Sequence, residues 1–216
     1  MGHLTGQQLQ IMEEAATNMK MCIYAICKNE IKHIDRWLEA VKDADEVVVL
    51  DTGSIDGTWE VLQASGVKCE QKIIEPFRFD AARNYALSLI SDDCEICLPL
   101  DIDMFLTNDF CKRIKNVWET GLSILQMPLY HLNTNNLTSK FAHARHGCVW
   151  VYPVHEQVQH KGYVKSTIDV MIIHDRIGEP IAHEFYLPLA EVGIKENPYN
   201  PYCQKVYQYE LEAISK

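Results

Sequence analysis

The sequence predicts an α/β fold in which a mostly parallel sheet is flanked by helices. Short apolar runs of strand length alternate with segments whose apolar residues recur at helical spacing, and the links between them are short. Acidic or polar residues follow directly after several of these runs, where open α/β sheets place their ligand sites. The second half changes to shorter strand-like pieces, which predict a mixed α/β region.

The first half is predicted to follow the order β-α-β-α-β-α-β. Its strands are expected at residues 21–27, 47–50, 67–74 and 95–100, each rich in apolar or β-branched residues. The helices between them are expected at residues 34–41, from Trp59 onward, and at 78–90. Asp56 precedes the second helix and is a candidate N-cap. Such alternation implies crossover connections between parallel strands.

A helix at about 108–119 begins the second half. The strands that follow it are expected at residues 123–130, 140–144, 149–152 and 164–173. Beyond them, apolar residues at helical spacing on both sides of residues 197–201 predict two C-terminal helices. We therefore expect three parts: an N-terminal segment, helical or flexible, at 1–20; an α/β domain at 21–178; and a helical extension at 179–216.

Composition limits the classes of function. The chain has 216 residues, of which 47% are hydrophobic and 23% charged, as is usual for a globular protein. Lys and Arg number 20 against 30 Asp and Glu, so the net charge of −10 argues against nucleic acid as a partner. No apolar run approaches the ~20 residues of a transmembrane helix, and the N-terminus has no secretion signal. A cytoplasmic location is expected.

Eight cysteines are scattered along the chain, several within apolar runs where a reduced thiol acts as a small hydrophobe. Cys94 and Cys97 form a C-x-x-C pair, which would suit zinc or redox chemistry, but the chain has no second such pair. The alternative is structural: Cys97 faces the core, and Cys94 lies in the turn after Ser91-Asp92-Asp93.

The strongest candidate site is Asp101-Ile102-Asp103, which follows the apolar run Ile96–Leu100. Residues two apart in an extended segment point the same way, so the two carboxylates can share one hard divalent cation. A metal held in this manner can bind a diphosphate. Because a D-x-D sequence also arises by chance, a pair of acidic residues that merely begins a loop is the alternative.

Four motifs together resemble the family-2 glycosyltransferases, whose GT-A fold is Rossmann-like. They are Lys28-Asn29-Glu30, the segment Asp51–Thr58, Arg83-Asn84 and Asp101-Ile102-Asp103, in the family's order and spacing over about residues 21–175. The chain looks most like small cytosolic members with a helical extension. The resemblance implies transfer of a sugar, with inversion, from a nucleoside-diphosphate sugar, usually a UDP-sugar, to a glycan, lipid or peptide acceptor. It leaves the donor sugar and the oligomeric state open.

The resemblance also implies the donor-binding residues. Asp51 would accept the imide N–H of the nucleobase, although the residues alone equally support a turn-initiating role before Thr52-Gly53. Lys28 and Glu30 would line the same site. Arg83 would bind the nucleotide or diphosphate through its forked donors. A salt bridge to Asp80, one turn earlier, is the alternative, and Asn84 is expected to be structural.

The metal is expected to be Mn²⁺ or Mg²⁺, which prefer oxygen ligands. By resemblance, Asp103 is the direct ligand, Asp101 contacts the ribose or binds through water, and His174 closes the site after the strand-like run Val170–Ile173. A lone histidine after a strand is more often a satisfied loop residue, so His174 depends on the resemblance.

Inverting transfer needs a general base on the acceptor side. The family's usual acidic base motif is not recognisable here, and Val154-His155-Glu156-Gln157 resembles a V-H-E segment of this subgroup. We expect Glu156 to be the base, with His155 either orienting it or acting as the base itself. A surface glutamate in a loop is the alternative.

Other classes of protein fit less well. In haloacid-dehalogenase phosphatases the second aspartate is followed by Thr or Val two residues later and the pair lies near the N-terminus, whereas here Met104-Phe105 follow. A nucleotidyltransferase of the sugar-nucleotide type would need a glycine-rich loop near residue 25, which the sequence lacks. A non-catalytic nucleotide-binding protein of the same fold remains the main alternative.

Overall fold

The computed structural model describes residue 6, residues 18–176 and residues 182–215. Most of the predicted segment 1–20, and the predicted boundary between 178 and 179, lie outside the described residues. The parallel half of the main sheet has the order β3-β2-β1-β4. Its strands are β1 (Met21–Cys27), β2 (Glu46–Asp51), β3 (Lys68–Gln71) and β4 (Ile96–Pro99), and the helices between them are α2 (Ile34–Val41), α3 (Thr58–Ser65) and α4 (Phe79–Ser88). The predicted order of the first half is confirmed.

The mixed half of the sheet continues from β4. A long antiparallel hairpin of β6 (Leu122–His131) and β7 (Asn136–Ala144) follows α5 (Phe110–Val117), and β7 is the strand that pairs with β4. β11 (Ile172–His174) runs parallel to β6, and β5 (Met104–Leu106) closes this edge antiparallel to β11. A separate two-stranded sheet contains β8 (Val149–Val151) and β9 (Gln157–Gln159).

Three of the predicted strands differ from those observed, and the first of these, expected at 140–144, begins at Asn136 as β7. The strand expected at 164–173 is two strands, β10 (Tyr163–Ser166) and β11, which pair with successive parts of β6. Thr167 and Asp169 hydrogen-bond to each other between them, a local turn that competes with strand pairing. The strand expected at 67–74 ends at Gln71. The strands β5 and β9, which have only three residues each, were not predicted from the sequence.

Alternation along β1 builds a separate core on each face of the sheet. Met21, Ile23 and Ala25 face one cluster, which includes Trp37 of α2 and Ile114 of α5. Cys22 and Tyr24 face the other cluster, where α4 and β8 contribute Ala82, Ala86 and Trp150. Because both faces are covered, the central parallel strands β1 and β4 are apolar throughout rather than alternating with polar residues.

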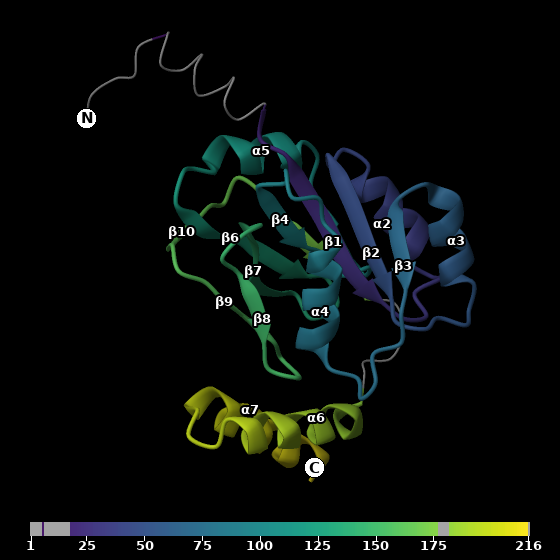
Figure 1. The fold of residues 1–216 in the computed structure, drawn as a ribbon, viewed down its shortest axis with the longest axis vertical. Coiled ribbons are helices and arrows are strands. Elements are labelled where there is room, and N and C mark those ends of the chain that lie inside the picture. Colours follow the sequence, from purple (N-terminus) through teal and green to yellow (C-terminus); the bar gives the residue numbers. More distant parts are fainter. Residues whose placement is uncertain (1–5, 7–17, 177–181, 216) are drawn as a thin grey trace.

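The two predicted C-terminal helices are present. α6 (His183–Glu196) and α7 (Pro201–Ile214) pack against each other and lie across the end of the domain toward which β1 runs (Figure 1). The Asn200 side chain caps α7 by accepting from the backbone N–H groups of Tyr202 and Cys203. No helix in the described part of the chain combines the length and the apolar character needed to cross a bilayer.

Candidate active site

A cavity of about 600 Å³ lies beyond the carboxyl ends of β1 and β4. Several residues predicted for the donor and metal sites line it together: Lys28, Glu30, Arg83, Asp101, Asp103 and His174. Other residues predicted for the site do not line this cavity: Asp51, His155 and Glu156. The fold therefore gathers the D-x-D motif and the loop after β1 at one edge of the sheet.

The short strand β5 brings His174 to the D-x-D motif. It begins directly after Asp103, and its antiparallel register places Met104 opposite His174. As a result Asp103 Oδ2 lies 2.9 Å from His174 Nε2. On its other side His174 is the register partner of His131 in β6, and their two Nδ1 atoms are 2.9 Å apart. Burial and the neighbouring His174 lower the pKa of His131, whose Nε2 meets Thr138 Oγ1.

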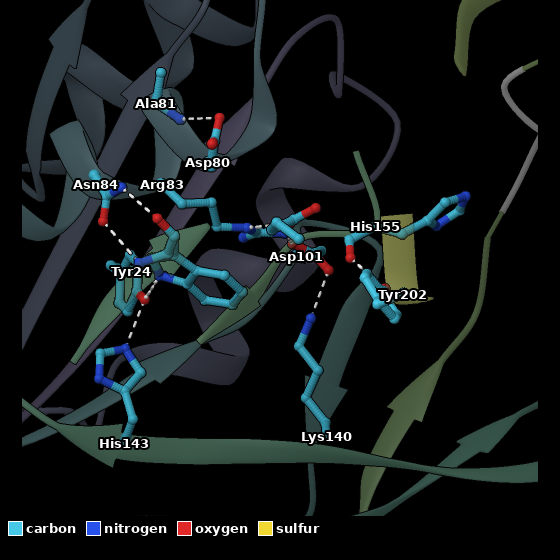
Figure 2. A network of polar contacts seen from close by, with 12 residues as sticks. Tyr24, Asp80, Ala81, Arg83, Asn84, Asp101, Lys140, His143, His155 and Tyr202 are labelled. Carbon is cyan, nitrogen blue, oxygen red and sulfur yellow. Dashed lines mark hydrogen bonds and ion pairs between the residues drawn. The ribbon is translucent and has the colours of Figure 1, made fainter. Parts of the chain in front are cut away.

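Asp101 has a different role from Asp103. Its Oδ1 accepts from Arg83 Nη2 at 2.6 Å and its Oδ2 from Lys140 Nζ at 2.7 Å, so that α4 and β7 both reach it (Figure 2). Burial opposes its ionisation, but Arg83 and Lys140 outweigh burial and hold the pKa of Asp101 well below its usual range. Within the described residues, no three His, Cys, Asp or Glu side chains form a ready-made metal site.

Arg83 joins Asp101 to Glu156. Its Nε donates to Glu156 Oε1 at 2.8 Å, and the residue is only 6% exposed. Burial alone would disfavour the charged form, but Asp101 and Glu156 raise the pKa of Arg83 above its usual range. The alternative partner, Asp80, is paired with Arg78 instead. Among the described residues the Nη1 atom of Arg83 has no hydrogen-bond partner.

A buried polar network lies under Arg83. The Arg83 guanidinium carbon lies 5.3 Å from the centre of the Trp150 ring, and the Trp150 indole N–H donates to Tyr24 Oη at 2.7 Å. The Tyr24 hydroxyl in turn donates to His143 Nε2 at 2.7 Å (Figure 2). The His143 Nδ1–H donates to the carbonyl of Ala144. Every member is satisfied, and burial lowers the pKa of His143 to about 4.

Asn84, expected to be structural, exchanges two hydrogen bonds with the backbone of Trp150. Its amide donates to the Trp150 carbonyl at 2.8 Å and its oxygen accepts from the Trp150 N–H at 2.9 Å. These contacts attach β8 to α4, so Trp150 is held beneath the guanidinium of Arg83. The structural interpretation of Asn84 is thereby confirmed.

The Asp51–Thr58 motif braces the loop that carries Lys28 and Glu30. Asn29 adopts a left-handed conformation (φ 59°), and its N–H donates to Ser54 Oγ at 2.8 Å. The Glu30 N–H donates to Thr58 Oγ1 at 2.8 Å. Burial raises the pKa of Glu30 to about 7, and the nearby charge of Asp103 adds to this effect.

Asp51 itself is fully buried and has the turn-initiating role that was left open. Its Oδ1 accepts from the N–H groups of Gly53 and Ser54, at 2.8 and 2.9 Å, and from Gln71 Nε2 at 3.0 Å. Burial disfavours its charge, but hydrogen bonds from Ser54 and Gly53 hold the pKa of Asp51 below its usual value. A role in reading a nucleobase stays a prediction.

The residues predicted as the catalytic base lie on the far side of Arg83. Glu156 contacts Arg83, and His155 points away from it: His155 Nε2 lies 2.6 Å from Oε1 of Glu210 on α7. His155 Nε2 is thus occupied by Glu210, and a role of His155 in orienting Glu156 stays a prediction.

The cysteines have the structural role given as the alternative to a zinc or redox site. The Cys94 and Cys97 side chains are both buried, and Cys94 follows the turn at residues 91–93. All eight cysteines are free.

Sequence reasoning missed several residues of this site. Lys140 lies on β7, which pairs with β4, and His131 lies on β6, which pairs with β11. No local sequence pattern predicts these pairings. Arg176 lies two residues after His174 and lines the cavity. An aromatic and apolar part of the wall contains Ile73, Ile74, Phe77 and Phe79, together with Phe185 and Tyr186 of α6. Those of α6 were assigned to a separate extension, which concealed their contribution.

Comparison with known proteins identifies the family. Residues 22–171, well over half of the chain, match the model of glycosyl transferase family 2. The chain belongs to this family. No curated protein matches the family-2 chain. Its membership agrees with the resemblance predicted from the four motifs.

Solved structures show the same fold at low sequence identity. S. aureus TarS has a TM-score of 0.62 and 14% identity, over 89% of this chain and 43% of TarS. Glucosyl-3-phosphoglycerate synthase from Mycobacterium tuberculosis, in complex with Mn²⁺, UDP-glucose and phosphoglyceric acid, has a TM-score of 0.57 and 15% identity, over 88% of this chain and 83% of that enzyme. The chain thus spans less than half of TarS. These neighbours confirm the GT-A fold.

The buried His143 should make stability fall in acid. Because the folded pKa of about 4 is below the unfolded value of about 6.5, the unfolded chain binds the extra proton between these two values. Stability due to this group is therefore lost as pH falls, by about 2 kcal/mol between pH 7 and pH 5. His143→Gln, measured by urea unfolding at both pH values, should lose less stability than wild type. The exposed His146→Gln should keep the wild-type loss, and equal losses in all three proteins would refute the prediction.

Removal of the Arg83 charge should destabilise the domain. Arg83→Met removes the cation paired with Glu156 and one of the two cations paired with Asp101. We expect this loss to lower the free energy of unfolding by about 3 kcal/mol. Lys42→Met removes an exposed lysine paired with Glu39 and should leave the urea midpoint unchanged. If the two variants unfold at the same midpoint, Arg83 is not an electrostatic centre of the fold.

Proposed function

We propose that this chain transfers a sugar from a nucleoside-diphosphate sugar, most often a UDP-sugar, to an acceptor with inversion at the anomeric carbon. The observation that carries the proposal is the convergence of Asp101, Asp103 and His174 on one cavity of a family-2 domain. The Mycobacterium tuberculosis neighbour was solved with Mn²⁺ and UDP-glucose, which supports the same class of donor here.

A divalent metal fits the donor set of this site. Asp103 offers a carboxylate oxygen and His174 an imidazole nitrogen, and Mg²⁺ and Mn²⁺ sites commonly combine one or two protein ligands with phosphate oxygens and water. We assign both residues as ligands, with Asp101 acting through water or on the ribose. When bound, the metal would neutralise charge on the departing diphosphate.

The histidine pair would hold His174 in the form that binds metal. A metal on Nε2 requires the ring proton on Nδ1, and that proton can be donated to His131 Nδ1, which lies 2.9 Å away. His131 can then donate from its Nε2 to Thr138 Oγ1. This relay fixes both the tautomer and the ring plane of His174.

Arg83 and Lys28 supply positive charge for the donor. The Nη1 atom of Arg83, which has no partner within the described part of the chain, suits an oxygen of the nucleotide or diphosphate, and Lys28 lines the same cavity. Glu30 lines the same cavity and would accept a hydrogen from the donor. Asp51 would accept the imide N–H of the nucleobase.

Glu156 is our proposed general base. It is held by Arg83, whose other contact is Asp101, so one guanidinium separates the base from the donor-binding carboxylate. His155 is the weaker candidate because its Nε2 is occupied by Glu210. The base would take the proton of the acceptor hydroxyl as that oxygen attacks the anomeric carbon.

Loss of Asp103 should abolish metal-dependent donor binding. In calorimetric titrations of UDP with Mn²⁺, wild type should bind, and EDTA should remove the binding. Asp103→Ala should show no binding, whereas Asp92→Ala, at a 96% exposed side chain, should match wild type. Equal UDP affinity in Asp103→Ala and wild type would overturn the metal assignment.

Loss of the Glu156 carboxylate should separate binding from chemistry. Glu156→Gln should keep Mn²⁺-dependent UDP binding and lose roughly 100-fold or more of its turnover, measured as UDP release from the UDP-sugar that wild type hydrolyses fastest. Glu191→Gln, at an exposed position of α6, is the matched control. Retained turnover in Glu156→Gln would exclude it as the base. Metal-dependent nucleotide binding without turnover of UDP-, GDP- or CMP-sugars by wild type would favour the non-catalytic alternative.

A further inference from the structure

The segment Tyr152–Glu156, between β8 and β9, contacts the C-terminal hairpin formed by α6 and α7. Its residues Tyr152, Pro153 and Val154 line a small gap shared with residues of α6 and α7, including Ala190, Gly193 and Tyr202. The carbonyl of Pro153 accepts from the N–H of Phe79 at the start of α4. The segment therefore lies between the two parts and ends at Glu156, the residue that contacts Arg83.

Two residues of this segment have backbone conformations that need support. Tyr152 (φ 77°) and His155 (φ 48°) both occupy the left-handed region, which is unfavourable for side chains of this size. Such conformations persist where surrounding contacts determine them. Here the contacts come from α7 and from its N-cap.

The helix α7 holds His155 at two points. The Tyr202 hydroxyl donates to the His155 carbonyl at 2.5 Å (Figure 2), and Glu210 Oε1 lies 2.6 Å from His155 Nε2. A third contact runs from the Asn200 side chain to the Tyr152 hydroxyl at 2.7 Å. The hairpin thus holds both left-handed residues of the segment.

Glu210 is an unusual residue for a helix that lies across the end of a domain. It is fully buried, and its second oxygen lies 2.7 Å from His183 Nδ1 at the start of α6. A buried carboxylate is costly unless it is paired and hydrogen-bonded, so Glu210 favours the one arrangement in which both histidines reach it. One of these histidines immediately precedes the proposed base.

We propose that Glu210 is a positioning residue for the catalytic site, acting through His155 to aim Glu156 at Arg83. This inference rests on the proposed function, and it makes the C-terminal hairpin a working part of the site rather than an appendage. Because Glu210 and His155 do not line the donor cavity, loss of the Glu210 carboxylate should slow the chemical step and leave donor binding unchanged. Small displacements of a catalytic group are enough to lower turnover strongly.

The test compares Glu210→Gln with Glu212→Gln, an exposed position two residues along the same helix. Glu210→Gln should lower kcat for UDP-sugar hydrolysis roughly tenfold or more, with the UDP affinity and binding stoichiometry in Mn²⁺ unchanged. Tyr202→Phe, which removes only the hydroxyl that donates to His155, should lower kcat in the same direction and remains available if Glu210→Gln fails to fold. Glu212→Gln should behave as wild type.

Hydrogen–deuterium exchange gives a readout independent of turnover. Glu210→Gln and Tyr202→Phe should speed exchange at residues 152–158 and leave β1 and β4 protected. The double variant His155→Ala with Glu210→Gln should lose no more kcat than the worse of the two single variants, because both residues act through the same contact. If the variants exchange faster but the wild-type protein shows no turnover, the positioning contact is supported and the proposed function is refuted. Unchanged exchange and unchanged kcat in both variants would overturn the inference, as would equal loss of UDP-binding stoichiometry and kcat.

Discussion

The buried guanidinium of Arg83 is the constraint on which the rest of the site depends. A cation that is 6% exposed needs anionic partners at hydrogen-bond distance, and it has two, Asp101 and Glu156. Asp101 in turn is paired with Lys140, so two cations and two anions balance within one chain of contacts. These four side chains come from α4, the loop after β4, β7 and the loop before β9. Their pairing therefore ties the parallel half of the sheet to the mixed half.

The same constraint explains why the two aspartates of the D-x-D motif differ. Both oxygens of Asp101 are engaged by cations, which makes it an organiser of the site and a poor candidate for direct coordination without rearrangement. Among the described residues, the Asp103 carboxylate hydrogen-bonds to the His174 side chain, and Asp103 lines the cavity. The sequence predicted an extended segment in which the two carboxylates share a face. Residues 102 and 103 instead form a turn, in which the Met104 N–H donates to the Asp101 carbonyl at 2.9 Å, so the two carboxylates meet different partners.

The sequence predicts features that depend on neighbouring residues better than features that depend on residues far apart in the chain. The strands β1, β2 and β4 are continuous apolar runs, and each was predicted within one residue at either end. The three-residue strand β5 carries no periodic signal, yet its register with β11 is what brings His174 to Asp103. Lys140 and Glu210 were missed for the same reason: each is defined by a partner far away in the chain, and hydrophobic periodicity describes only neighbours.

The C-terminal hairpin extends this argument to the boundary of the domain. If α6 and α7 were only an appendage, their contacts with the domain would be expected at exposed polar residues that tolerate change. Instead they use a fully buried carboxylate and a capping asparagine, and both reach left-handed residues of the segment that precedes β9. A buried charge and two unfavourable backbone conformations each cost stability, so they are retained together only where they stabilise one another. The loop that carries Glu156 therefore takes its conformation both from the α/β domain and from the described helices α6 and α7.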